Sequence, residues 1–233
     1  MYSLKIITTE DGSNSIFIPE LNETYHSVHG AITESRHVFI KNGFRYIIGQ
    51  KNPASIKILE IGLGTGLNVL LTILENRIFN LDIHYTAIEA YPVPFEIISQ
   101  LNYVSQIGGH DTNLLFENIH SGEWNKYFKI SGNFYLRKIN CLFQDFNAGS
   151  ERFDLIYYDA FAPGKQPDIW ELPVLKKAVL SMNSSGAIVT YTARGQLKRD
   201  LKSLGLIVET VQGPPGKKEM IRAVIPFSVP GQY

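Results

Sequence analysis

The sequence predicts an α/β fold, in which a mostly parallel β-sheet is covered by helices on both faces. Residues 57–68 pass from a short apolar run through a glycine-rich loop into a segment with helical spacing. Ile83–Glu89 then forms a second apolar run. Strands that alternate with helices are typical of parallel sheets, because two parallel neighbours need a crossover connection. The chain of 233 residues, 44% hydrophobic and 19% charged, is sufficient for such a core.

The glycine-rich loop is the most informative part of this first unit. Gly62, Gly64 and Gly66 are spaced G-x-G-x-G, which differs from the G-x-G-x-x-G of dinucleotide-binding folds. An acidic residue, Glu60, lies two positions before the first glycine. The arrangement is similar to the first motif of Rossmann-like S-adenosylmethionine (SAM) methyltransferases. The resemblance implies that glycine backbone approaches the carboxylate of SAM and that the acid helps to hold its amino group.

Two later strand ends supply further cofactor candidates. Glu89 ends the second strand, where an acid typically accepts hydrogen bonds from ribose hydroxyls. A third strand is expected at Phe134–Phe143, followed by Asp145 and Phe146, which are placed to meet adenine; the alternative for Asp145 is a turn residue. The predicted cofactor-binding residues are therefore Glu60, Gly62, Gly64, Thr65, Gly66, Asn68, Glu89, Asp145 and Phe146.

The first 50 residues are predicted to form an extension packed on a core domain of residues 51–233. Residues 1–20 have the pattern of a hairpin, and Thr33 is expected to cap a helix with Val38 and Phe39 facing inward. The polar, aromatic segment 21–30 is predicted to be either a wall or lid of the active site or a surface loop.

No metal site is expected. The histidines of the N-terminal region lack ligand spacing, and the single cysteine, Cys141, lies in an apolar run and is expected in the core. No stretch approaches the ~20 apolar residues of a membrane span, and no signal-peptide pattern is present. We therefore expect a cytoplasmic protein without membrane contact.

The second half of the chain completes the predicted sheet. Residues 103–134, with Trp124, Tyr127 and Phe128, are expected to be a helical excursion, and Gly186–Tyr191 a buried strand. The last strands form a hairpin around 213–220. The full prediction is a Rossmann-like, mostly parallel seven-stranded sheet with one antiparallel strand. Phe153–Tyr158 is its central strand, and Asp159 at the end of that strand should point into the active site, because ligands of open α/β sheets bind at the carboxyl ends of strands.

Charge is distributed unevenly along the chain. Residues 1–163 contain 12 Lys/Arg and 17 Asp/Glu, whereas residues 164–233 contain 10 and 5. A basic stripe runs along the helix predicted after residue 194, and two more lysines follow in the last turn. This asymmetry indicates either a polyanionic partner or an ordinary solvated face. The candidate contact residues are Arg194, Lys198, Arg199, Lys217 and Lys218.

Four motifs resemble one family, the methyltransferase domain of MnmC. They are residues 33–39 (TESRHVF), 62–68 (GLGTGLN), 159–170 (DAFAPGKQPDIW) and 216–220 (GKKEM), in the family's order along nearly the whole chain. The resemblance implies SAM-dependent N-methylation of 5-aminomethyl-2-thiouridine at the tRNA anticodon wobble position. Asp159 is the catalytic candidate, because a carboxylate there can accept an N–H of the amine, direct its lone pair at the methyl group and stabilise the charge that grows on nitrogen. Phe161 and Tyr158 are expected to pack around the base, with the core as an equal alternative for Tyr158. The family's FAD-dependent domain is not found in this sequence, so a separate enzyme is expected to supply the aminomethyl substrate.

Three alternatives remain open from the residues alone. The first is aminopropyl transfer, or methylation of another small amine, on a similar fold. The second is a NAD(P)-linked oxidoreductase, which Glu89 favours and the glycine spacing does not. The third is a tRNA-binding module without catalysis, against which the intact glycine loop and Asp159 argue.

Overall fold

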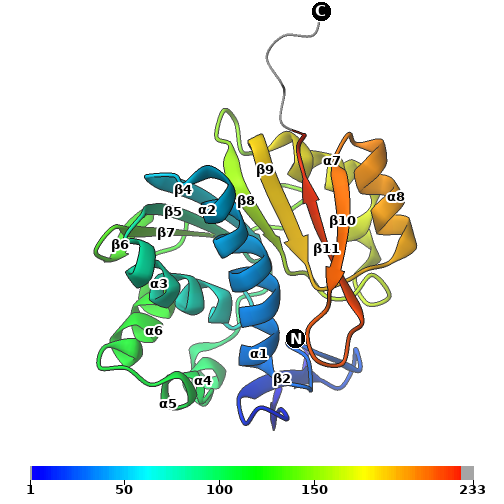
Figure 1. The fold of residues 1–233 in the computed structure, drawn as a ribbon. Coiled ribbons are helices and arrows are strands. Elements are labelled where there is room, and N and C mark those ends of the chain that lie inside the picture. The colour runs from blue at the N-terminus through cyan, green and yellow to red at the C-terminus, as the bar shows by residue number, and fades with distance from the viewer. Residues whose placement is uncertain (1, 227–233) are drawn as a thin grey trace, which may run out of the picture.

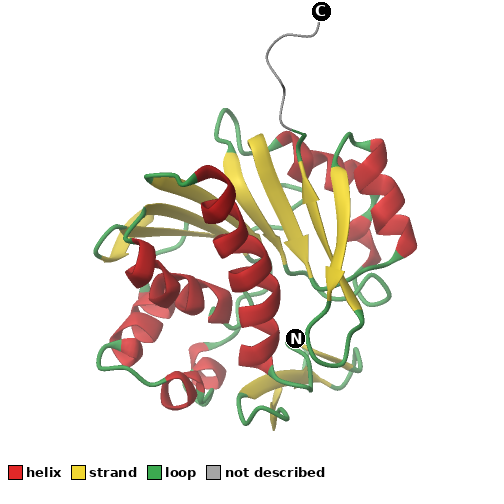
Figure 2. Ribbon diagram, in the orientation of Figure 1, coloured by secondary structure: helices red, strands yellow, loops and turns green. Residues whose placement is uncertain are grey.

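The computed structural model describes residues 2–226, which form one sheet of eight strands and one of three (Figures 1 and 2). The large sheet has the strand order β10-β11-β9-β8-β4-β5-β7-β6. In chain order its strands are β4 (Ser55–Ile61), β5 (Asp82–Ile88), β6 (Tyr127–Ser131), β7 (Phe134–Ile139), β8 (Phe153–Tyr158), β9 (Met182–Thr190), β10 (Ile207–Gln212) and β11 (Glu219–Val224).

Seven of these strands form the arrangement predicted from the sequence. The strands β7, β5, β4, β8 and β9 are parallel to one another, and β11 is antiparallel to both β9 and β10. The predicted α/β class, a mostly parallel sheet with one antiparallel strand among the seven, is therefore confirmed. The parallel order brings the carboxyl ends of β4, β5, β7 and β8 to the same edge of the sheet.

The eighth strand differs from the prediction. Helices occupy the first part of the segment 103–134, as α5 (Tyr103–Ile107) and α6 (Thr112–Ser121), but Tyr127 and Phe128 belong to β6, which is antiparallel to β7. The rings of Trp124 and Phe128 lie 5.0 and 5.9 Å from Nζ of Lys138 on β7. Closely spaced aromatic residues occur in both strands and helices, so this pattern does not distinguish the two. Pairing with β7 makes residues 127–131 a strand.

Helices cover both faces of the large sheet (Figure 2). The helix α3 (Leu67–Phe79) follows the glycine loop on one face, and α7 (Leu172–Leu180) and α8 (Gly195–Ser203) pack on the other. Adjacent residues of β8 divide between the two layers, with Tyr157 in the α3 cluster and Tyr158 in the α7–α8 cluster, as the pleat of a strand requires. Two short helices remain, α4 (Phe95–Ile98) and the 3-10 helix η2 (Pro167–Trp170).

The N-terminal region forms the small sheet and a long helical segment. The predicted hairpin is β1 (Lys5–Thr8) and β2 (Asn14–Ile18), to which β3 (Glu23–Thr24) adds a third antiparallel strand. Helix follows continuously as α1 (Ala31–Ser35), the π-helical η1 (Arg36–Phe44) and α2 (Arg45–Lys51).

The predicted N-cap of this helix is wrong. Thr33 lies inside α1, and the residue at the N-cap is Gly30. Asp11 and Ser13 of the hairpin accept hydrogen bonds from the first N–H groups of the helix. Side chains that are distant in the sequence therefore cap this helix, in place of a local N-cap side chain.

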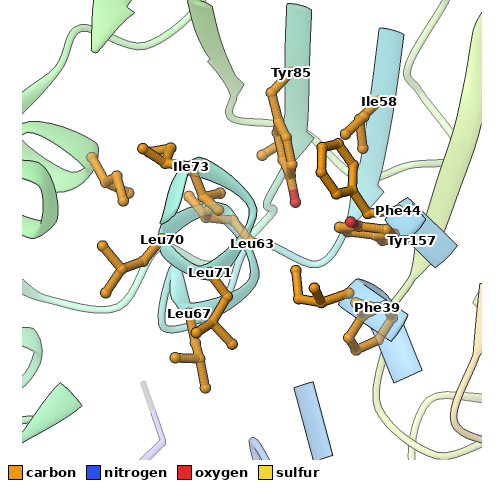
Figure 3. Packing of buried hydrophobic residues seen from close by; sticks show 14 of the residues in the cluster. Phe39, Phe44, Ile58, Leu63, Leu67, Leu70, Leu71, Ile73, Tyr85 and Tyr157 are labelled. Carbon is orange, nitrogen blue, oxygen red and sulfur yellow. The ribbon is translucent and has the colours of Figure 1, made fainter. Parts of the chain in front are cut away.

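The long helical segment lies across the large sheet (Figure 1), and its Phe39 lies beside Tyr157 of β8 (Figure 3). Val38 and Phe39 are buried, as predicted, and the ring centroids of Phe39 and Tyr157 are 5.1 Å apart. A Cβ at Gly43 would lie 3.0 Å from Tyr157 and from Val189, so glycine permits this approach. The proposed division at residue 50 therefore separates the chain in sequence, while its two parts share one core. None of the helices in residues 2–226 combines the length and apolar composition that a membrane span needs.

Candidate active site

A cavity of about 990 Å³ opens at the carboxyl ends of the central strands. Four loops of the large sheet line it, at Ile61–Gly64, Ile88–Tyr91, Cys141–Gln144 and Asp159–Ala162. Residues 21–28 and Glu34 form the facing wall, and Tyr191 and Lys217 complete the lining beside Asp159. The segment 21–30, for which the sequence leaves a wall or a surface loop open, is therefore a wall.

The three glycines of the loop are required for three different reasons. Their φ angles are 95° (Gly62), 51° (Gly64) and 72° (Gly66), a region that disfavours side chains. A Cβ at Gly62 would lie 2.4 Å from the carbonyl oxygen of Asp159, and one at Gly66 would lie 3.0 Å from His120. Gly64 faces the cavity, where a Cβ would be 3.1 Å from the ring of Tyr25.

Four predicted cofactor residues lie behind the cavity wall. Glu60, Thr65, Gly66 and Asn68 do not line the cavity. The Asn68 amide Nδ2 donates to Glu60 Oε1 (2.9 Å) and to Asp159 Oδ2 (2.8 Å), while Thr65 Oγ1 lies 2.7 Å from His26 Nε2. The side chains of Glu60, Thr65 and Asn68 therefore support the wall from behind, through hydrogen bonds that link Asn68 to Glu60 and Asp159 and Thr65 to His26. Burial raises the pKa of Glu60 well above its usual range.

Glu89 lines the cavity at the end of β5. Its two carboxylate oxygens accept the backbone N–H groups of Gly64 (3.0 Å) and Tyr91 (2.9 Å). Burial raises its pKa, and these backbone donors oppose the shift. Glu89 thus ties the glycine loop to the neighbouring strand end.

The third strand end differs from the prediction. β7 ends at Ile139, earlier than the expected Phe143, so the cavity is lined by Cys141, Leu142, Phe143 and Gln144. Asp145 is exposed and Phe146 is buried against Phe143, and neither lines the cavity. Cys141, expected in the core, is half-buried at the cavity.

Asp159 occupies the centre of the cavity edge. Its backbone N–H donates to Ile61 O (3.0 Å), which holds the end of β8 beside the glycine loop. Burial, with the nearby charge of Glu34, raises the pKa of the Asp159 carboxyl to about 7, against the hydrogen bond from Asn68 and the charge of Lys217. A carboxyl group with this pKa exchanges its proton near neutral pH.

Aromatic and charged side chains line the cavity together with Asp159. The rings of Phe161 and Tyr25 meet edge to face, 5.1 Å apart. Lys217 Nζ lies 2.7 Å from Glu34 Oε1 and 3.9 Å from the centroid of the Tyr191 ring. Tyr158, which the sequence leaves between core and site, is in the core. His26 is also buried, and burial lowers its pKa to about 4.

Only one of the predicted basic contact residues, Lys217, lines the cavity. Lys198 forms an ion pair with Glu219 (2.9 Å), and Arg199 donates to Gln196 (2.7 Å) on α8. Arg194 and Lys218 are exposed. The sequence pattern missed Lys165, which lines the cavity and donates from Nζ to Leu21 O (2.7 Å), joining two walls. Within residues 2–226 no group of His, Cys, Asp and Glu is arranged to hold a metal ion.

Comparison with known proteins identifies the cofactor. Residues 124–226 match a family model described as S-adenosyl-L-methionine-dependent methyltransferase. A crystal structure of MNMC2 from Aquifex aeolicus is 22% identical with a TM-score of 0.76, a match that covers 100% of this chain and 74% of that one. Relatives from Idiomarina loihiensis and Leptospira interrogans are 26% and 27% identical over 86% and 87% of this chain, and both are named tRNA 5-methylaminomethyl-2-thiouridine biosynthesis bifunctional protein MnmC. The chain is an MnmC-like SAM-dependent methyltransferase domain.

The domain spans 35% and 32% of the lengths of these two relatives. Its cavity fits SAM, because Gly64 leaves room that a side chain would fill, Glu89 offers a carboxylate, and Ile88, Leu142 and Phe143 offer an apolar surface. A volume of about 990 Å³ is at the upper end of small-molecule sites and leaves room for an acceptor beside the cofactor. Because the matched family uses SAM, the alternative of a NAD(P)-linked oxidoreductase is excluded.

Proposed function

We propose that this methyltransferase methylates the primary amine of 5-aminomethyl-2-thiouridine at the wobble position of tRNA, producing the 5-methylaminomethyl form. The observation that carries the proposal is Asp159, a carboxyl group with a pKa of about 7 in a cavity that the paired rings of Tyr25 and Phe161 also line. The names of the curated relatives supply the product, 5-methylaminomethyl-2-thiouridine.

The chemistry requires a neutral amine. When bound, SAM supplies a methyl group on a sulfonium; the S–CH₃ bond breaks as the N–CH₃ bond forms, and the acceptor nitrogen must first lose a proton. An alkylamine has a pKa near ~10.4, and a carboxylate with a reference pKa of ~3.9 is too weak a base to remove that proton efficiently. A pKa of about 7 at Asp159 lowers this mismatch to roughly 5 kcal/mol.

Asp159 then has two tasks in this proposal. Its carboxylate accepts an N–H of the amine and so directs the nitrogen lone pair, and it takes or relays the proton that leaves. Asn68 holds one carboxylate oxygen, Oδ2, which fixes the orientation of the group. Tyr25 and Phe161 are proposed to pack on the uracil ring, and Glu89 with Leu142–Gln144 to contact the ribose and adenine of SAM.

We propose the basic residues outside the cavity as the tRNA contact. Arg194 lies beside the cavity-rim loop, since a Cβ at Gly164 would be 3.3 Å from its Nη2. Arg199 and Lys218 are exposed on the same C-terminal part of the chain, where positive charge predominates. Phosphates are the expected partners of such groups. Lys198 contributes less, because Glu219 already neutralises it.

Mass spectrometry of tRNA nucleosides tests this function. tRNA that carries 5-aminomethyl-2-thiouridine is incubated with SAM and the protein, and a gain of one methyl group on that nucleoside is expected. The Asp159→Asn protein serves as the control. Methylation of a free polyamine or other small amine, with no change in the tRNA nucleoside, would replace tRNA as the acceptor.

A further inference from the structure

Lys217 lies in the cavity rather than on the surface where a phosphate contact would place it. Its Nζ is 2.7 Å from Glu34 Oε1 and 3.9 Å from the centre of the Tyr191 ring, and Tyr191 OH donates to Ala160 O (2.9 Å), next to Asp159. A carboxylate together with an aromatic face is the environment that holds an alkylammonium ion. Lys217 fills that environment itself.

The turn between β10 and β11 holds Lys217 in this place. Gly216 has a φ of 80°, and a Cβ there would lie 2.0 Å from the ring of His29. A Cβ at Gly213 would lie 2.5 Å from the carbonyl oxygen of Lys217. Two side-chain-free positions therefore let the turn close tightly against the cavity wall, which directs the lysine inward.

Glu34 also has a structural role, through a second hydrogen-bond partner. Its other oxygen, Oε2, accepts the backbone N–H of Ser27 (2.8 Å) and so supports the wall that carries Tyr25. The same carboxylate faces the cavity near Asp159, and its charge opposes the ionisation of Asp159. A structural carboxylate at this position needs a counter-ion if Asp159 is to remain usable.

We propose that Lys217 is a positioning residue for methyl transfer: its ammonium neutralises Glu34, so that Asp159 and not Glu34 receives the ammonium of the acceptor. This inference rests on the proposed function for the identity of the acceptor. The effect of Lys217 and Glu34 on the ionisation of Asp159 involves only residues of this chain and does not depend on the acceptor. The site then binds the single ammonium group of the acceptor close to the Lys217 ammonium. A polycationic acceptor would bring further positive charge near Lys217, so such acceptors are disfavoured.

Charged and titratable groups approach Asp159 from several elements. Glu34 from α1 raises the pKa of Asp159, and Lys217 from the β10–β11 turn lowers it. Glu60 on β4 lies behind Asn68, and burial keeps its pKa high. Tyr191 and Tyr85 also lie near Asp159, and burial raises the pKa of both. The Lys217 side chain is 34% exposed and that of Glu34 8%, so the Lys217 ammonium is the charge that a substitution removes with less disturbance of the core.

Titration of Asp159 by NMR tests the proposal without any acceptor. The protein is labelled with ¹³C at aspartate Cγ, and the Asp159 signal is assigned from its loss in Asp159→Asn. Lys217→Met is expected to raise the titration midpoint by about one pH unit, because the charge of Glu34 is then uncompensated. Lys217→Arg keeps the charge and should keep the midpoint, and Lys218→Met is the matched control from the exposed neighbouring position.

The second half of the test removes the carboxylate. Glu34→Gln retains an oxygen for Ser27 N–H and should lower the midpoint, and the Lys217→Met/Glu34→Gln double variant should return toward the wild type. An unchanged midpoint in Lys217→Met, or a raised midpoint that persists in the double variant, overturns the proposal. Thermal unfolding and SAM affinity of each variant verify that the site is intact.

Single-turnover methylation of the aminomethyl tRNA links the titration to the reaction. In Lys217→Met the acid limb of the pH–rate profile should move upward with the midpoint, a loss of about fivefold at pH 7 that is recovered at pH 9. A uniform loss at every pH would show that Lys217 only holds the turn. If the wild type methylates no aminomethyl tRNA, the proposed function fails, while the NMR titration still decides whether Lys217 controls Asp159.

Discussion

The two halves of the cavity are held together by different kinds of bond. On the side assigned to the cofactor, the Glu89 carboxylate accepts two backbone N–H groups, from Gly64 and Tyr91. On the side assigned to the acceptor, Asp159 and Glu34 are held by the side chains of Asn68 and Lys217. The first half therefore depends on backbone conformation, whereas the second depends on a balance of side-chain charges. Substitutions that change charge should act mainly on the second.

The largest expected effect is in the acceptor half. Asp159→Asn keeps an oxygen that can accept from Asn68, so the geometry is retained while the base is lost. The single-turnover rate should fall by about 10²–10⁴, the usual contribution of a general base. SAM affinity, measured by calorimetry, should stay within about twofold of the wild type. A rate near that of the wild type would mean that Asp159 is structural.

The pH dependence of the wild-type rate also distinguishes a catalytic from a structural role of Asp159. Asp159 must be ionised to accept a proton, and its pKa is about 7, so the rate should rise about tenfold per unit below that pH and level off above it. Asp159→Asn should show no such limb. A wild-type profile that is flat between pH 5 and 8 would disconnect Asp159 from the proton transfer.

The next effect is in the cofactor half and comes from backbone strain. Gly64→Val places a branched side chain at a φ of 51°, with its Cβ 3.1 Å from the Tyr25 ring. Strain of about 1–3 kcal/mol corresponds to a loss in SAM affinity of roughly 5- to 150-fold, and steric conflict with the cofactor adds to it.

Gly49→Ala is the matched control, because a Cβ at this position in α2 has nothing within 4 Å. It should leave SAM affinity unchanged and raise helix stability by about 0.5–1 kcal/mol. Equal SAM affinity in both folded variants would exclude Gly64 from the cofactor site.

A smaller effect is expected at the carboxylate of the cofactor half. Glu89→Gln keeps an acceptor for Gly64 N–H and removes the charge. The loss of a charge-assisted hydrogen bond to ribose should weaken SAM binding by about 1–2 kcal/mol. Calorimetry of SAM binding measures this loss, and Asp159→Asn, which should keep the SAM affinity, separates it from an effect of Asp159. No loss would remove Glu89 from the proposed ribose contact.

The smallest expected effect concerns basic residues outside the cavity and the salt dependence of tRNA affinity. Arg199→Ala and Lys218→Ala remove exposed cations, and each should flatten the log–log dependence of tRNA affinity on salt by about 0.7–0.9. Lys198→Ala should flatten it less, because Glu219 already pairs with that side chain. Lys126→Ala, directly before β6 at the opposite edge of the large sheet, is the control. Filter-binding titrations that give one slope for all four variants would exclude this surface from the contact.

The comparison of the two halves also explains which parts could be predicted. Glu89 and Gly64 belong to consecutive strand–loop units, so apolar runs and glycine spacing placed both at one edge of the sheet. Asp159 was predicted for the same reason, because it directly follows a buried strand. The expected end of the third strand at Phe143 was wrong, since where β7 ends depends on its pairing with β5, and Asp145 and Phe146 do not line the cavity.

The sequence by itself determined the α/β class, the strand–glycine–helix unit and the acid at the end of β8, because each depends on residues adjacent in the chain. Tertiary structure alone decided how the charges are paired. Glu34 and Lys217 are 183 residues apart, and Asn68 reaches Asp159 across 91. No local pattern encodes such contacts, which exist only because the parallel sheet and the helical segment 31–51 bring these loops to one edge. The pKa of Asp159, and with it the proposed chemistry, follows from that convergence.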